Sequence, residues 1–205
     1  VTGVQTCALP ISEGFRVQTL SIPQELTLSV TGLAFDARTN LWICTREGEI
    51  WRRGGGVWQQ FCTGLQDPTG LWADPKSTDV YVQQRSELTR LRDEDNDGEM
   101  DVFESVGAGW GTDAARQERV VGVVRTPDGG FVGAISASGD RLASGDQRYR
   151  GWSFVVDAQR QFVPWSTGLR APTGVGWGPE GSLWVTERSE EHTSELQSHL
   201  NLVCR

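Results

Sequence analysis

The chain has 205 residues, of which 37% are hydrophobic and 22% charged, and its formal net charge is −8 at pH 7. The acidic balance and the lack of a basic stripe argue against nucleic acid as a partner. No apolar run reaches the roughly 18 residues that a membrane span requires, so the sequence predicts one domain with its own hydrophobic core.

The two ends of the chain are expected to be foreign to the folded domain. Residues 1–11 and the segment that begins at Arg188 can be encoded by opposite strands of one DNA segment, and both resemble translated sequencing adapter. We therefore assign residues 1–12 and 188–205 as non-native tails and residues 13–187 as the domain. The apolar start of the chain is accordingly not interpreted as a signal peptide.

This division leaves no histidine in the domain, because His192 and His199 both lie in the C-terminal tail. Two cysteines remain in the domain, Cys44 and Cys62. We place them on the second and fourth strands of one meander, which separates them by roughly 10 Å, or two strand spacings. A disulfide cannot span that distance, so the sequence predicts two free, buried thiols.

A repeated strand pattern organises the domain. Each repeat has a glycine in an apolar run, followed nine or ten residues later by a second apolar strand. The four glycines, which are 38, 52 and 52 residues apart, are Gly32, Gly70, Gly122 and Gly174. A period of about 40–50 residues with four short strands per unit is typical of a β-propeller. A generic β-sandwich is the competing architecture.

The predicted fold is therefore all-β, a β-propeller arc of about three and a half four-stranded blades. The first blade is predicted at 30–36, 41–46, 49–53 and 57–62, the second at 69–74, 80–84, 87–92 and 101–106, and the third at 119–125, 131–136, 152–157 and 161–166. A fourth blade begins at residue 173 and contributes two strands.

Residues 93–104, which read D-E-D-N-D-G-E-M-D-V-F-E, fit the pattern of an EF-hand-like calcium loop with a glycine, Gly98, at its sharp turn. Ca²⁺ takes about six to eight oxygen ligands, and carboxylates this close would repel one another without a cation. The flanking residues alternate like strands, so we expect a calcium-binding β-hairpin; the alternative is a solvated acidic turn. The predicted ligands are Asp93, Asp95, Asp97, Glu99 (through its backbone carbonyl), Asp101 and Glu104.

The strand order predicts on which face of the ring each turn lies. First-to-second and third-to-fourth turns share one face, whereas second-to-third turns and blade links share the other, where ring-shaped enzymes usually keep their pockets. The calcium loop is a third-to-fourth turn, so we expect it to face away from the pocket and to be structural. The candidate binding face comprises residues 107–118, which include Trp110, residues 136–150, and the turns at Arg46 and Arg85.

Several phrases resemble the β-propeller of bacterial membrane-bound dehydrogenases, a group similar to PQQ-dependent glucose and sorbosone dehydrogenases. The resemblance spans nearly all of residues 15–187. It implies a six-bladed ring, a periplasmic or extracellular location, PQQ as a cofactor of the intact protein, a sugar or alcohol as substrate, and often a fused cytochrome c module. The phrases are GLAFD at 32–36, TREGEIW at 45–51, ELTRLRD at 87–93, GWG at 109–111, YRGW at 149–152 and GLRAP at 168–172.

One departure bears on catalysis. Members of the family tend to carry a Glu-His phrase before the third blade, whereas Glu118 is followed here by Arg119. In the quinone-dependent enzymes a histidine acts as base, so the catalytic residues of this chain stay unassigned. The arginines that are candidates to hold a carboxylated quinone or an acidic sugar are Arg46, Arg85, Arg119 and Arg150. Their alternative role is that of solvated or structural ion-pairing side chains.

Three functions stay open at this point. The first is a quinone-linked sugar or alcohol dehydrogenase-like propeller, of which this segment alone is expected to be inactive. The second is a non-catalytic, calcium-stabilised propeller that binds a glycan or a protein. The third is a calcium-dependent lactonase, which ranks last because such enzymes hold calcium in the central channel, whereas the calcium pattern here lies in one loop.

Overall fold

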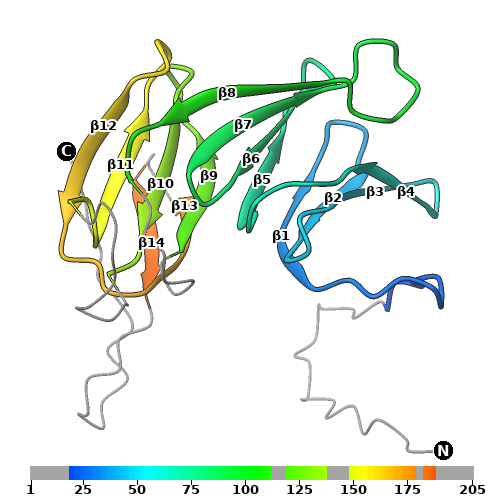
Figure 1. The fold of residues 1–205 in the computed structure, drawn as a ribbon, viewed down its shortest axis with the longest axis horizontal. Coiled ribbons are helices and arrows are strands. Elements are labelled where there is room, and N and C mark those ends of the chain that lie inside the picture. Colours follow the sequence, from blue (N-terminus) through cyan, green and yellow to red (C-terminus); the bar gives the residue numbers. More distant parts are fainter. Residues whose placement is uncertain (1–18, 112–118, 138–147, 179–181, 188–205) are drawn as a thin grey trace, which may run out of the picture.

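The structure is a computed structural model that describes residues 19–111, 119–137, 148–178 and 182–187. All of its regular elements are antiparallel β-strands (Figure 1), as the sequence predicts. Both predicted tails, residues 1–12 and 188–205, lie outside the described residues. The described part of the chain contains no helix that is long and apolar enough to cross a membrane.

The described strands form three four-stranded meanders and one hairpin, each ordered as it runs along the chain. The predicted blades are confirmed, with differences only at strand ends. The first blade contains β1 (Val30–Phe35), β2 (Leu41–Thr45), β3 (Ile50–Gly54) and β4 (Val57–Cys62), and the second contains β5 (Gly70–Ala73), β6 (Val80–Gln83), β7 (Glu87–Arg92) and β8 (Val102–Ala108). The third contains β9 (Val120–Arg125), β10 (Phe131–Ile135), β11 (Trp152–Val156) and β12 (Phe162–Thr167), and the fourth contains β13 (Pro172–Trp177) and β14 (Leu183–Glu187).

The first strands of successive blades lie next to one another, β1 against β5, β5 against β9, and β9 against β13 (Figure 1). The repeated glycine lies on this strand because the neighbouring chain comes very close. A Cβ atom at Gly32 would stand 2.8 Å from the Cα atom of Gly70, and one at Gly122 would stand 2.9 Å from the side chain of Val175. Real Cβ atoms do not approach other atoms this closely, so the glycines set the distance between blades.

The threonine that precedes the glycine links two blades. Thr31 Oγ1 donates a hydrogen bond of 2.6 Å to the backbone carbonyl of Pro68, and Thr69 Oγ1 donates in the same way to the carbonyl of Val120. Each acceptor stands just before the matching position of the next blade. The third blade has Val121 at this position, so a hydroxyl donor is missing there.

The two cysteines confirm the predicted strand assignment. Cys44 on β2 lies opposite Ile50 on β3, which in turn lies opposite Cys62 on β4. Both thiols are free and buried between the first and second blades. Burial raises the pKa of Cys44 to about 11 and that of Cys62 to about 12, so both stay neutral at physiological pH.

The threonine bond between blades can be tested by mutation. We expect Thr31→Val to lower the free energy of unfolding by about 1–2 kcal/mol, because the buried carbonyl of Pro68 loses a hydrogen-bond donor. Thr173→Val is the matched control, since among the described residues the exposed hydroxyl of Thr173 bonds to Thr186 of its own hairpin and to no other blade. Urea denaturation measures both variants, and equal losses of stability would contradict a link between blades.

Candidate functional site

The acidic loop joins β7 to β8, which confirms its predicted place as a third-to-fourth turn (Figure 1). It gathers three carboxylates: one oxygen atom from each of Asp93, Asp95 and Asp101 lies within 4.8 Å of the other two. Asp93 is buried, with 8% of its surface exposed, whereas the other two carboxylates are exposed. Hard oxygens at this spacing suit a divalent cation such as Ca²⁺.

Backbone N–H groups of the loop hold these carboxylates in place. Asp93 accepts hydrogen bonds from the N–H groups of Asn96 at 2.7 Å and Gly98 at 3.0 Å. Asp101 accepts one from the N–H of Glu94 at 2.7 Å. The sharp turn requires a φ of +91° at Gly98, a conformation that glycine adopts without strain. The loop is therefore organised around its acidic centre by its own backbone.

Three predicted ligands lie outside this carboxylate group. The Asp97 side chain accepts a hydrogen bond of 2.8 Å from the N–H of Glu99, whose predicted contribution is its backbone carbonyl rather than its side chain. Glu104 lies on β8 opposite Arg90 and forms an ion pair with it. The second oxygen of Glu104 is 2.5 Å from Arg160, which follows β11 in the third blade. Glu104 thus joins two blades through arginine.

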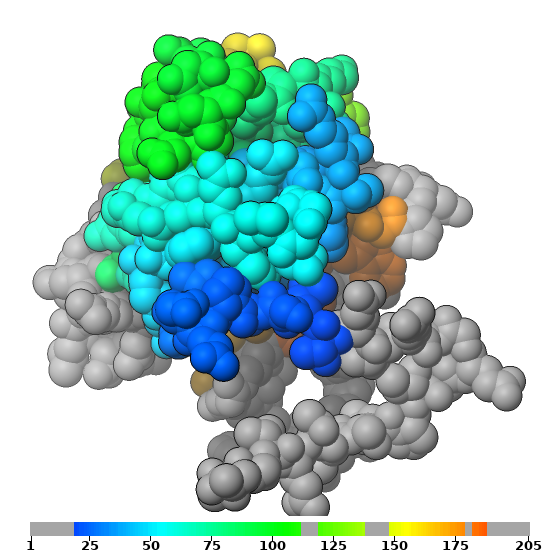
Figure 2. Space-filling view, turned by 90° about the vertical axis from the view of Figure 1, so that its right-hand side faces the viewer, coloured from blue at the N-terminus to red at the C-terminus, as the bar shows by residue number. Residues whose placement is uncertain are grey.

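The acidic loop also contacts the first blade. The N–H of Met100 donates to the carbonyl of Phe61 on β4 at 3.0 Å. Gln59 Nε2 donates to the carbonyl of Asp97 at 3.4 Å. Figure 2 shows the loop (green) directly beside the first blade (blue to cyan). The expected role of fastening one hairpin is therefore too narrow, because the loop also links the first blade to the second.

The four arginines of the predicted binding face all lie on the expected side of the strand order. Arg46 follows β2 and Arg85 follows β6, while Arg119 and Arg150 precede β9 and β11. Arg46 and Arg119 are exposed. Arg85 lies 3.9 Å from the carboxylate of Asp67, and only 12% of its side-chain surface is exposed. Arg85 therefore takes part in the packing between the first and second blades.

Trp110 corrects part of the predicted binding face. Its side chain is only 1% exposed, and its indole N–H donates to the carbonyl of Arg85 at 2.9 Å. The ring stacks on Phe154 with centroids 4.8 Å apart. Trp110 thus fills the core between the second and third blades. Residues 112–118 and 138–147 of the predicted face lie outside the described residues.

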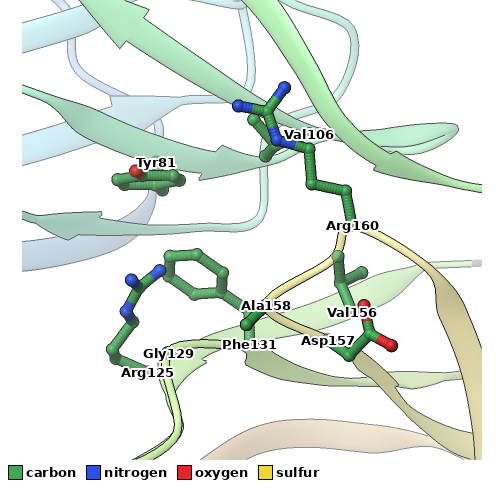
Figure 3. A pocket seen from close by; sticks show the side chains of 9 residues that line it. All are labelled: Tyr81, Val106, Arg125, Gly129, Phe131, Val156, Asp157, Ala158 and Arg160. Carbon is green, nitrogen blue, oxygen red and sulfur yellow. The ribbon is translucent and has the colours of Figure 1, made fainter.

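Two cavities open on the opposite face, among the first-to-second and third-to-fourth turns. The smaller one, of about 150 Å³, lies between the second and third blades (Figure 3). There the guanidinium of Arg125 stands 4.5 Å from the ring centre of Phe131 and 5.6 Å from that of Tyr81, while Arg160 reaches across from the neighbouring turn. This aromatic site is filled by the protein's own cation and so links the blades.

The larger cavity, of about 560 Å³, lies between the first and second blades beside the acidic loop. Neither cavity could be predicted from the sequence. Both form where turns of different blades meet, and no single repeat shows which side chains will face one another across that space.

No family model and no curated protein matches the chain. Solved structures do match. The PQQ-bound aldose sugar dehydrogenase of Streptomyces coelicolor gives a TM-score of 0.62 at 17% identity, over 83% of this chain and 59% of that one. The PQQ domain of a pyranose dehydrogenase from Coprinopsis cinerea gives 0.62 at 15%, over 79% and 44%. A gluconolactonase from Xanthomonas campestris gives 0.56 at 14%, over 76% and 52%.

The fold is a partial β-propeller. The competing β-sandwich is wrong, because the sheets meet side by side through their first strands. At these identities the likeness establishes the fold alone, and the chain spans between 44% and 59% of the length of these three structures. Dehydrogenases and a lactonase share this propeller, so the fold does not decide between their activities.

The Glu104 ion pairs make the stability of the folded state depend on pH. The hydrogen bond from Arg160, together with the charge of Arg90, lowers the pKa of Glu104 below its usual value of 4.5. A carboxylate of this kind stabilises the folded state above its unfolded pKa, and that stability is lost as the pH falls through the folded pKa. Because 30% of the side-chain surface is exposed, we expect Glu104→Gln to cost only about 1 kcal/mol at pH 7.

The difference in the free energy of unfolding between wild type and Glu104→Gln should be complete at neutral pH. It should shrink below pH 4.5, the usual pKa of this side chain. Urea denaturation across this range, with a chelator present to remove divalent ions, measures it. Glu99→Gln in the same loop is the control and should match the wild type. A cost that does not change with pH would show that the ion pairs are not its source.

Proposed function

We propose that this propeller belongs to a quinone-linked sugar dehydrogenase, whose intact form oxidises a sugar or alcohol. The observation that carries the proposal is the set of family-like phrases, among which ELTRLRD at 87–93 contains β7 and runs directly into the acidic loop. The fold shared with two PQQ-containing sugar dehydrogenases is compatible with it. A periplasmic or extracellular location and a cytochrome c module that receives electrons are the corresponding proposals for the intact protein.

The cofactor proposal depends on the face that carries the second-to-third turns. PQQ is a carboxylated quinone, and guanidinium groups bind carboxylates with paired hydrogen bonds. The side chains that would hold it are the exposed Arg46 and Arg119, together with Arg85 and Arg150 on the same face. Bound PQQ supplies the acceptor for the two electrons that leave the substrate carbon. The arginines of this chain bind and orient its carboxylates.

A second function is favoured by one feature of the sequence. Residues 13–187 contain no histidine to act as the base. A non-catalytic propeller that binds a glycan or a protein is therefore the alternative to the dehydrogenase. The gluconolactonase likeness supports a hydrolase less well, because the carboxylates that gather among the described residues all come from one peripheral loop rather than from several blades.

We also propose that the acidic loop binds Ca²⁺. Asp93, Asp95 and Asp101 provide the carboxylate oxygens, and the backbone carbonyl of Glu99 is the predicted neutral ligand. Asp97 is left for a water-mediated or outer contact, because its carboxylate does not belong to the group formed by Asp93, Asp95 and Asp101. A cation here removes the repulsion within the group and steadies the loop against the first blade, with which it shares hydrogen bonds.

Thermal unfolding tests the calcium site. At a Ca²⁺ concentration about one hundred times the dissociation constant, binding should add about 2–3 kcal/mol of stability, which corresponds to a rise in Tm of roughly 5–10 °C. Asp95→Ala combined with Asp101→Ala should remove this rise. Glu104→Gln is the control, since its carboxylate binds arginine, and it should keep the full rise. A rise that persists in the double variant would place the ion elsewhere.

Quinone binding tests the cofactor proposal. Tryptophan fluorescence, titrated with PQQ in the presence of Ca²⁺, should show saturable quenching. Arg46→Gln combined with Arg119→Gln should weaken PQQ binding by at least about tenfold, and both positions are exposed, so folding should not suffer. Arg38→Gln on the other face is the control and should bind normally.

Dye-linked oxidation of aldoses by the intact protein then separates the two functions. PQQ-dependent turnover supports the dehydrogenase, whereas tight PQQ binding without turnover on any aldose supports the non-catalytic propeller. Binding of PQQ that is indifferent to the arginine substitutions would contradict the proposed cofactor site.

A further inference from the structure

The larger cavity, between the first and second blades, lies apart from the proposed quinone face. Its walls are the turns after β1 and β5, parts of β3 and β4, and the near side of the acidic loop. Its volume of about 560 Å³ is in the range of small-molecule sites. Because its lining is mostly polar, its occupant is expected to be recognised by charge and hydrogen bonds.

The carboxylates that line this cavity already have partners. Asp36 accepts four hydrogen bonds, among them one of 2.7 Å from the amide of Asn40 and one of 3.0 Å from the indole of Trp42. Asp79 forms ion pairs with Arg92 at 3.2 Å and Arg90 at 3.6 Å. The remaining lining carboxylates accept backbone N–H groups and are Asp74, Asp93 and Asp97.

The cations that line the cavity have no such partners. Arg38, Arg52 and Lys76 form no ion pair with any residue that the structure describes. The Nε atom of Arg52 is buried without a hydrogen-bond partner, and its guanidinium lies 5.5 Å from the ring centre of Trp42. The Nε atom of Arg53 also lacks a partner, so what distinguishes Arg52 is that its side chain lines the cavity without an ion pair. The recognition groups left over in the cavity are therefore positively charged donors.

We propose that this cavity binds a small polar ligand through an oxyanion group, either a carboxylate or a phosphate. Arg52, fixed between β2 and β4 and backed by Trp42, receives the oxyanion, since the planar guanidinium matches both groups. Lys76 on the turn after β5 adds a second positive charge from the other blade. Gln59 and Ser77 offer hydrogen bonds to the rest of the ligand, as a sugar acid or sugar phosphate would require.

Calorimetric titration of the 205-residue chain, without PQQ and with a chelator present, tests this site independently of the proposed function. The probes are inorganic phosphate and glucuronate, with glucose as the uncharged comparison. Arg52→Gln should weaken binding of the charged probes by at least about tenfold. Arg53→Gln is the matched control: Arg53 is the next residue of β3, points to the other side of the sheet, lies over Trp58, and should leave binding unchanged.

Two further variants keep the test decisive if Arg52→Gln does not fold. Arg52→Lys keeps the charge but loses the planar donor pair, so it should bind with intermediate affinity. Lys76→Gln, at an exposed turn, should weaken binding about threefold and reduce its dependence on salt.

Binding of phosphate alone would identify a phosphate-bearing ligand, and binding of glucuronate alone a carboxylated sugar; either supports the site. Equal affinity for glucose and glucuronate, equal effects of the Arg52 and Arg53 substitutions, or no binding of either charged probe would overturn the proposal.

Discussion

The close approach of neighbouring first strands is the constraint on which the rest of the molecule depends. At Gly32 the backbone of the next blade comes so near that no side chain fits, and the adjoining Thr31 hydroxyl uses that nearness to reach a backbone carbonyl. Once this spacing is fixed, each four-stranded sheet must fan outward. The outer parts of the blades then pack on one another through aromatic side chains, such as Trp110 on Phe154.

That same geometry decides where chemistry can occur. A wedge opens between two sheets as they diverge, and turns from both blades meet at its wide end. The acidic loop, the Glu104 ion pairs and both cavities lie in these wedges. Carboxylates there are bound by backbone N–H groups or arginines, whereas Arg52, which lines the larger cavity, forms no ion pair with a described residue. The proposed metal site and the proposed anion site thus both lie in wedges between blades.

The sequence predicted the strands closely because each blade is a local unit. Side-chain alternation and turn residues such as those at 127–129 can be recognised within a few positions, and a glycine in an apolar run marks every first strand. It predicted Asp93, Asp95 and Asp101 as a group for the same reason, since one loop contains all three. The local sequence pattern was therefore sufficient to predict the strands and the group of carboxylates in the acidic loop.

The failures come from contacts between blades. Glu104 satisfies the last position of the calcium pattern, but the pairing of its carboxylate with Arg160, which lies 56 residues further along the chain, could not be predicted from that pattern. Trp110 lies in a segment that reads as a surface connection, but its ring enters the neighbouring blade. No repeat taken alone contains this information. Which side chains of neighbouring blades contact one another can be determined only when the curvature of the arc is known.

Val121 breaks the uniformity of the repeat at one junction between blades. The seam between the third and fourth blades lacks the hydroxyl bridge of the other two and relies there on the contact of Gly122 with Val175. An indole N–H of Trp177 supports the seam from its edge, through the carbonyl of Arg125 at 2.8 Å. In repeat proteins each junction contributes its own share of cooperativity. The junction at Val121 therefore has no hydroxyl bridge to contribute to the cooperativity of the repeat.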